Sequence, residues 1–272
     1  MNNFKTGTFS GHNNQMGSFA DVTVTETEFE YKFIDWHYHE TPYFSVVTAG
    51  HCLESNKRKT YHCSADSLLF HNIGESHYNI KSGDISFGFQ VEISPKWYEK
   101  FEVSLSDLPA TAQVDHPGVK LLLHNIYKEA RLFGTAPDPA ANLTVDMLLL
   151  EAFETMRGVE SGLVSTRPRW VKKIDEILRE DYEQPLSLLE ISAELNVHWA
   201  HLSRDFSKYF RCNFSQYLRK IRVERSLSLL RKRSIPMADI ACMCGFADQS
   251  HFIRCFKQYT GLTPKGFRKI IK

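Results

Sequence analysis

The stretch from Leu186 to Arg268 constrains the fold of this chain most, because the same local pattern occurs in it twice. In the first copy, Ser187 and Glu190 have the spacing of a capping box, which starts a helix. Asn196 then stands where a turn needs a residue that tolerates a positive φ. We expect the short helix before this turn to pack through Leu189, Ser192 and Ala193. The helix after the turn places apolar side chains on one face at helical spacing, namely Leu202, Phe206, Tyr209 and Phe210.

The second copy repeats this plan further along the chain. Pro236 suits the first turn of a short helix, which is expected to pack through Ile240 and Ala241, and Gly245 supplies the turn. The next helix is expected to bury Phe252, Cys255, Phe256 and Tyr259. One helix over 215–231 joins the copies through Tyr217, Leu218, Ile221, Leu227 and Leu230. Thr263 and Pro264 cap and start a last helix.

The longer helix of each copy turns a polar and basic face outward. In the first copy this face carries Ala200, Ser203, Arg204, Ser207 and Lys208. In the second copy it carries Gln249, Ser250, Arg254 and Lys257. A short helix, a tight turn and a second helix with such a face form the plan of a groove-binding helix-turn-helix. For any single residue, a merely solvated helix surface is the alternative.

Residues 169–272 resemble the DNA-binding domain of AraC/XylS-type transcription regulators. The matching positions are 240–241, 245–252, Arg254, 256–257, Tyr259, 261–264 and 267–268. The resemblance implies sequence-specific binding to double-stranded promoter DNA and, most often, activation of transcription. Contacts with RNA polymerase would then accompany activation.

By this resemblance, the base-facing positions fall on Ala200, Ser203 and Arg204 in the first copy and on Gln249, Ser250 and Arg254 in the second. Arginine can pair with a guanine edge, glutamine with an adenine edge, and alanine can touch only a thymine methyl group. Lys208 and Lys257 on the same two faces are better placed to contact phosphates, which position a protein on DNA without specifying sequence.

The chain also departs from the family pattern at its turns. The family usually has glycine at Asn196 and a capping serine at His198 and Ala247. A lost serine cap costs a helix about 1 kcal/mol, so we expect weaker caps on both longer helices.

The charge of the chain is divided unequally. Residues 168–272 hold 20 Lys and Arg against 11 Asp and Glu, a net charge of +9, whereas residues 1–167 hold 13 against 21, a net of −8. A basic half beside an acidic half fits one part that meets phosphate and one that does not. No apolar run is long enough to span a membrane, and the first residues lack the apolar core of a signal peptide, so we expect a cytoplasmic protein. The six cysteines form no CxxC pair, and we expect reduced, mostly structural thiols.

The N-terminal half reads as β structure from Val22 to Ile93, after a mobile start over residues 1–20. Strict alternation from Ile85 to Ile93 predicts a half-buried strand. Several short strands without helices between them indicate a small sandwich or barrel. A helix over 118–133 follows, and a second over 143–157 places Leu143, Met147, Leu150 and Phe153 or Glu154 near one face. The resemblance to AraC-type regulators implies that these two helices form a dimer contact, and the alternative is that they only cover the barrel.

A histidine pair, His37 and His39, precedes one predicted strand, and His77 follows another. This order resembles the sequence motifs of the cupin barrel, in which three histidines can form an open metal site. The cupin carboxylate ligand, however, falls near Tyr43 or Phe44, and neither is acidic. The resemblance to AraC-type regulators also implies histidines that are usually not metal ligands. We therefore predict no metal site and no cofactor.

The interior of such a barrel is concave, and ligand pockets are mostly apolar with a few polar groups. Candidate residues lining this pocket are Trp36, His37, His39, His77, Phe87, Phe89 and Gln90. Burial in the ordinary core is the alternative for each aromatic residue.

The sequence thus predicts an α+β chain with a cupin-like β-barrel and helical hairpin over 1–157, a linker over 158–168, and an all-α double helix-turn-helix over 169–272. The leading hypothesis is a transcription regulator, not an enzyme, whose N-terminal domain senses a small molecule, forms a homodimer, or both. One alternative is a metal-binding cupin enzyme fused to a DNA-binding tail. The other is a regulator without a ligand, whose N-terminal domain serves only to dimerise.

Overall fold

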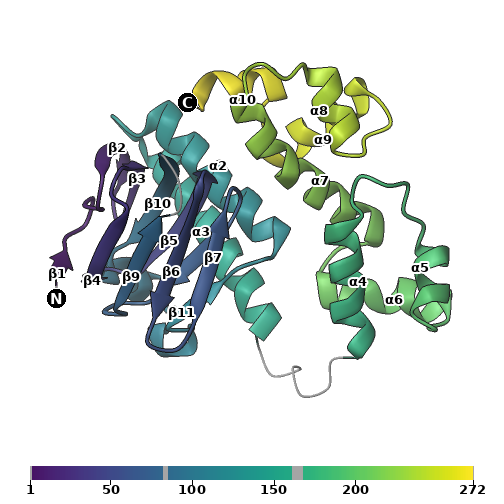
Figure 1. Ribbon diagram of the computed structural model, residues 1–272, viewed down its shortest axis with the longest axis horizontal. Coiled ribbons are helices and arrows are strands. Elements are labelled where there is room, and N and C mark those ends of the chain that lie inside the picture. Colours follow the sequence, from purple (N-terminus) through teal and green to yellow (C-terminus); the bar gives the residue numbers. More distant parts are fainter. Residues whose placement is uncertain (1, 82–84, 161–167, 272) are drawn as a thin grey trace. The chain divides into compact units, whose positions relative to one another are not determined.

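The computed structural model describes residues 2–81, 85–160 and 168–271 (Figure 1). The chain forms two compact units, Met1–Phe153 and Glu154–Lys272, called here the two-sheet domain and the helical domain. All described strands lie in the first unit, and the second is built from helices. The predicted α+β class is therefore confirmed.

The two-sheet domain consists of a five-stranded and a six-stranded sheet. The first has the order β1 (Asn2–Phe4), β4 (Phe33–His39), β9 (His77–Lys81), β6 (His51–Asn56) and β7 (Thr60–Ser64). The second has the order β11 (Thr111–Gln113), β8 (Leu68–His71), β5 (Tyr43–Ala49), β10 (Ser86–Ile93), β3 (Val22–Phe29) and β2 (His12–Phe19). The pairs are antiparallel except for β1 and β4.

The N-terminal residues differ from the prediction of a mobile start. β1 and β2 each add to the edge of a sheet, β1 beside β4 and β2 beside β3. Their Asn- and Ser-rich composition gave no strand signal, because backbone hydrogen bonds to an existing edge require no particular side chain.

The strand from Ser86 to Ile93 exists, but the prediction that it is half-buried was wrong. Helix α2 (Pro117–Phe133) covers its outer face, where the Phe89 ring stacks on Tyr127 with centroids 4.7 Å apart. The alternate residues face the other sheet, and Gln90 is fully buried there. Buried helices thus enclose the strand on one side and the second sheet encloses it on the other.

Helix α3 (Pro139–Glu160) begins four positions before the predicted start at Leu143. Pro139 does not end a helix but occupies its first turn, and the Asp138 carboxylate accepts a hydrogen bond from the Ala141 amide at 2.7 Å. The predicted face is only partly buried, since Phe153 is 1% exposed whereas Leu143 and Met147 are 59% and 61% exposed. The residues that pack inward are Val145, Leu149, Ala152, Phe153 and Met156. Helix α1 (Pro95–Lys100) and the 3-10 turn η1 (Leu105–Asp107) lie between β10 and β11 and had no sequence prediction.

The predicted linker over 158–168 is only partly described. Residues 158–160, where the linker was predicted to begin, form the end of helix α3, and Pro168 occupies the N-cap position of the next helix. Residues 161–167 lie outside the described part of the chain. The predicted domain boundaries remain a prediction.

The helical domain contains the seven remaining helices of the described chain. They are α4 (Arg169–Glu180), α5 (Leu188–Glu194), α6 (Trp199–Phe210), α7 (Phe214–Arg231), α8 (Met237–Met243), α9 (Gln249–Thr260) and α10 (Pro264–Ile270). The two predicted short helix–turn–long helix units, α5–α6 and α8–α9, are confirmed, as is the helix α7 between them.

Most predicted core residues of the helical domain are buried, but α5 turns a different face inward. Leu189 is 64% exposed and Ala193 is exposed, whereas Ile191 and Ser192 are buried. Ile191 joins a core formed with α4, α6 and α7. All six cysteines are free thiols, and Cys244 and Cys255 are buried, as the sequence predicted for Cys255. None of the helices in the described residues is both long and apolar enough to cross a membrane.

Candidate functional site

The two turns position the longer helices, α6 and α9. Asn196 has a φ of 51°, as predicted for the first turn, and Gly245 has a φ of 72° in the second. A Cβ atom at Gly245 would lie 2.6 Å from the Glu183 carbonyl oxygen, so the second turn requires glycine for space as well as for conformation.

Both longer helices have caps that the sequence reading did not find. The His198 Nδ1 atom accepts a hydrogen bond from the Ala200 amide at 3.3 Å. The cap of α9 is Asp248, not Ala247, and its carboxylate accepts from the His251 amide at 2.7 Å. The expected cost of the missing serines is therefore offset at both helices, because an imidazole and a carboxylate replace serine as the accepting group.

All eight residues predicted to contact DNA are exposed. They are Ala200, Ser203, Arg204 and Lys208 on α6, and Gln249, Ser250, Arg254 and Lys257 on α9. The opposite face of each helix is fixed by buried rings, such as Phe206 on α6 and Phe256 on α9. Each unit therefore presents a polar face from a rigid core, although no DNA contact is tested by this arrangement.

The two arginines of these faces have different surroundings. The Arg204 guanidinium donates to His201 Nδ1 at 2.8 Å and contacts an Asp205 carboxylate oxygen at 3.1 Å. Within the described ranges, Arg254 has no hydrogen-bond or ion-pair partner. Sequence reasoning missed both contacts. The offset of three between His201 and Arg204 is one that allows contact on a helix, whereas adjacent residues such as Arg204 and Asp205 do not normally face each other, so that contact had no sequence signal.

Trp199 at the start of α6 was also missed. Its side chain is 54% exposed and lies beside the predicted base-facing Ala200. The sequence shows only that this tryptophan directly precedes Ala200, whereas its exposure is known from the structure.

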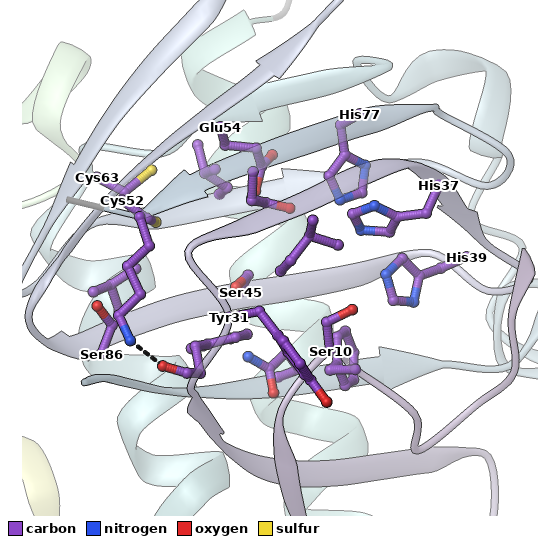
Figure 2. A pocket seen from close by; sticks show the side chains of 18 of the residues that line it. Ser10, Tyr31, His37, His39, Ser45, Cys52, Glu54, Cys63, His77 and Ser86 are labelled. Carbon is purple, nitrogen blue, oxygen red and sulfur yellow. Dashed lines mark hydrogen bonds between the residues drawn. The ribbon is translucent and has the colours of Figure 1, made fainter. Parts of the chain in front are cut away.

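A cavity of about 60 Å³ lies between the two sheets of the two-sheet domain (Figure 2). One water needs roughly 10–15 Å³ of such space, so the cavity admits a few waters or a very small ligand. Four of the predicted pocket residues line it, namely His37, His39, His77 and Gln90.

The other three predicted pocket residues, Trp36, Phe87 and Phe89, do not line this cavity. Successive side chains of a strand point to opposite faces, so Trp36 faces away from its neighbour His37. It packs on Tyr78, with the two ring centroids 5.0 Å apart. Phe89 likewise faces helix α2 while Gln90 faces the cavity. Phe87 is 38% exposed.

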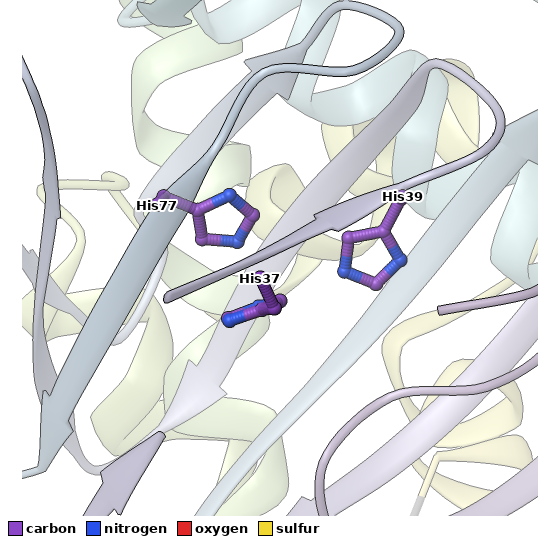
Figure 3. A group of neighbouring side chains, drawn as sticks. All are labelled: His37, His39 and His77. Atoms are coloured by element: carbon purple, nitrogen blue, oxygen red, sulfur yellow. The ribbon is translucent and has the colours of Figure 1, made fainter. Parts of the chain in front are cut away.

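Three histidines meet at one end of the cavity (Figure 3). The His37 and His77 rings lie 4.2 Å apart, and His39 lies 5.9 Å from His77. His37 Nδ1 is 2.8 Å from the Asp35 carbonyl oxygen, so Nδ1 carries the hydrogen and Nε2 keeps its lone pair.

Burial keeps these imidazoles neutral. It lowers the pKa of His37 and His77 to about 4 and that of His39 to about 2, with mutual repulsion adding to the effect at His37 and His39. Burial also lowers the pKa of a fourth histidine, His71. Neutral imidazole is the form that binds metals.

The three histidines have further polar neighbours in His71, Glu54 and Tyr43, which were not predicted from the sequence to belong to the pocket. Burial raises the pKa of Glu54 to about 8, so this carboxyl is largely protonated at neutral pH. Its Oε1 lies 3.3 Å from His71 Nε2, but both groups are neutral and the contact is not an ion pair. The Tyr43 hydroxyl lies 3.3 Å from His77 Nε2. Two groups could hold a metal ion, one of His37, His39 and His77 and one of Glu54, His71 and His77.

N-terminal residues pack against the same cluster. The Phe4 ring contacts His37 and the Phe9 ring stacks on His39 at 4.7 Å. The Gly7 amide donates to the buried Glu92 carboxylate at 2.6 Å. Burial raises the pKa of Glu92 to about 7.

Comparison with known proteins assigns both domains. The family model of an AraC-like ligand binding domain matches residues 19–153, and that of a helix-turn-helix domain matches 191–270. The chain is similar to the HTH-type transcriptional regulator GbdR of Pseudomonas aeruginosa, with 31% identity over 39% of this chain and 29% of GbdR. It is also similar to the Msm operon regulatory protein of Streptococcus mutans, with 30% identity over 46% of this chain and 44% of that protein.

These matches span less than half the length of either relative. A crystal structure of ToxT from Vibrio cholerae covers 94% of this chain, and the chain covers all of it, at 14% identity with a TM-score of 0.43. The two family models together span most of the chain, and the chain belongs to the AraC-type transcription regulators.

Proposed function

We propose that this chain regulates transcription by placing α6 and α9 against the bases of a promoter site. The observation that supports this most is the pair of exposed polar faces, each fixed from behind by a buried aromatic core. In this proposal Arg204 and Arg254 contact guanine edges, Gln249 contacts adenine, and Lys208 and Lys257 contact phosphates.

The test is selection of bound fragments from sheared genomic DNA, with an Arg204→Ala/Arg254→Ala variant as the matched control. The wild type should enrich a motif of two blocks about one helical turn apart, and the variant should not. Equal enrichment by both proteins would show that these arginines do not contact bases. Folding of the variant is checked by its thermal unfolding, which substitutions of exposed residues should leave unchanged.

We also propose that the cavity between the sheets binds a small polar effector. Support comes from buried polar atoms that face it, including the Gln90 amide nitrogen, which has no hydrogen-bond partner in the described chain. An effector controls DNA binding only if it binds two arrangements of the protein with different affinity.

The exposed Leu143 and Met147 on α3 support a further proposal, that this helix forms a homodimer contact. Exposed apolar side chains that neighbour each other on a helix mark interaction surfaces. A Leu143→Glu/Met147→Glu variant should sediment as a smaller species than the wild type. Activation of transcription, contact with RNA polymerase, the absence of catalysis and a cytoplasmic location all remain predictions.

A further inference from the structure

Three metal-ligating residues from three strands converge beside the cavity. Glu54 on β6, His71 on β8 and His77 on β9 each offer one ligand atom, and these atoms lie within 4.8 Å of one another. All three side chains are buried, with residue exposures of 6%, 1% and 3%. Glu54 and His77 also line the cavity itself, so the group adjoins the space open to small molecules (Figure 2).

The group contains buried polar atoms that lack partners. Among the described residues, neither ring nitrogen of His71 has a hydrogen-bond partner and Glu54 Oε1 has none, although His71 Nε2 lies 3.3 Å from Glu54 Oε1. The two atoms are close but lack the direction that a hydrogen bond needs. Buried polar side-chain atoms without a partner are rare in native proteins, and each needs an explanation.

The outer contacts of the group orient its ligand atoms. His77 Nδ1 lies 3.2 Å from the Glu75 carbonyl oxygen, which can only accept, so Nδ1 carries the hydrogen and Nε2 keeps its lone pair. Glu54 Oε2 accepts from the Asn79 amide at 3.1 Å, which leaves Oε1 for another contact. Metal-binding histidines and carboxylates are commonly held by such outer hydrogen bonds.

We propose that Glu54, His71 and His77 bind one divalent transition-metal ion. Two imidazoles and one carboxylate suit zinc or iron(II), whereas calcium and magnesium prefer oxygen ligands throughout. The Tyr43 hydroxyl, 3.3 Å from His77 Nε2, offers a further oxygen ligand beside the group. An ion held here can also be reached from the cavity by an effector with an oxygen or nitrogen donor.

This group is favoured over His37, His39 and His77 for two reasons. It includes a carboxyl group, which releases its proton when a dication binds and then compensates the buried positive charge, and the three-histidine group has none. Its fully buried atoms without a partner among the described residues are also more numerous, with three in His71 and Glu54 against His39 Nδ1 in the other group. The carboxylate was not recognised in the sequence because it lies on a different strand from the cupin position at Tyr43.

Metal binding at this site adds to the proposed effector function. Only an effect of the metal on DNA binding depends on that proposed function. Metal binding itself is measured on the full chain without DNA. The protein is stripped with a chelator and titrated with Zn²⁺ against a competing dye. Wild type should bind one ion per chain, and Glu54→Gln and His71→Phe should each weaken binding by at least about 100-fold. His62→Gln, a change at an exposed histidine of β7, is the matched control and should bind as the wild type does.

Glu54→Gln keeps the shape of the side chain and its oxygen acceptor toward Asn79, so it tests ligation with little disturbance of the fold. Zn²⁺ should raise the thermal unfolding temperature of the wild type and not that of this variant, while the two unfold alike without metal. The proposal is overturned if the wild type binds neither Zn²⁺ nor Co²⁺, or if Glu54→Gln and His71→Phe bind Zn²⁺ as tightly as the wild type. A failure of DNA binding in its separate assay would leave the metal result intact.

Discussion

The two domains differ in where they hold their polar groups: the two-sheet domain buries them and the helical domain exposes them. The two-sheet domain buries histidines and carboxylates between its sheets, and burial shifts the pKa of each, as at His39 and Glu92. The helical domain keeps Arg254 and Lys257 exposed on α9. A polar group inside contributes to the folding free energy, whereas one outside contributes to what the surface binds. Substitutions in the two domains should therefore change different quantities.

The largest effect is expected at Glu92, whose folded pKa of about 7 lies above the ordinary value of 4.5. Between these values the folded state holds a proton that the unfolded state has lost, so stability falls as the pH rises. The contribution is fully present below pH 4.5 and is lost as the pH rises through 7. Glu92→Gln is neutral at every pH and can still accept from the Gly7 amide.

We expect Glu92→Gln to be more stable than the wild type at pH 8 by about 3 kcal/mol and equal to it near pH 4. Urea unfolding at a series of pH values measures this difference. The buried histidines lose stability as the pH falls below 6.5, but both proteins share that loss, so it cancels in the difference. A constant difference between pH 4 and pH 8 would show that Glu92 has an ordinary pKa.

The next effect tests whether stability in the helical domain depends on its turns and not on its outward faces. Gly245→Ala puts a Cβ atom 2.6 Å from the Glu183 carbonyl oxygen at a φ of 72°. We expect a loss of roughly 2–3 kcal/mol in unfolding free energy. Asn196→Ala at the equivalent turn, with a φ of 51°, should cost only about 1 kcal/mol. Equal losses in thermal unfolding would show that the close approach at Gly245 relaxes freely.

Most of the helical domain followed from the sequence because its signals are local. The turn residues Asn196 and Gly245 and the cap at Thr263 act within a few positions of themselves. The exception was Leu189, which is exposed. A helix of seven residues has too few apolar positions to define a face, so the packing of α4, α6 and α7 decides it.

The candidate site in the two-sheet domain was only partly predictable. Successive side chains of a strand point to opposite faces, so Trp36 and Phe89 cannot share a face with their neighbours His37 and Gln90. The predicted pocket included residues from both faces of β4 and β10. Glu54 and His71 could not have been found this way. They lie on strands of different sheets, and only the closure of one sheet over the other brings them together.

On the outward faces, the comparison predicts losses of affinity without losses of stability. Arg254→Ala should weaken binding to the selected site by about 1–3 kcal/mol, and Arg204→Ala by less. The Arg204 guanidinium already contacts His201 and Asp205. To reach the edge of a DNA base it must break these contacts, whereas Arg254 has no such contacts among the described residues. Fluorescence anisotropy on matched and single-base-changed duplexes measures both. A greater loss at Arg204 would mean that its two partners orient it toward DNA instead of holding it back.

The smallest effects are expected at the lysines, which should weaken binding to all sequences alike. A phosphate contact contributes through counterion release, so Lys257→Ala should cost less than about 1 kcal/mol and reduce the salt slope by about 1. Lys208 lies 5.4 Å above the Tyr209 ring, a contact that it gives up on reaching a phosphate, so Lys208→Ala should cost less still. Titration of both variants with specific and random duplexes, over a range of salt concentrations, measures the loss of affinity and the salt slope for each lysine. If Lys257→Ala reduced affinity for the specific site alone, this lysine would contact a base, and the division of α9 into base and phosphate positions would be wrong.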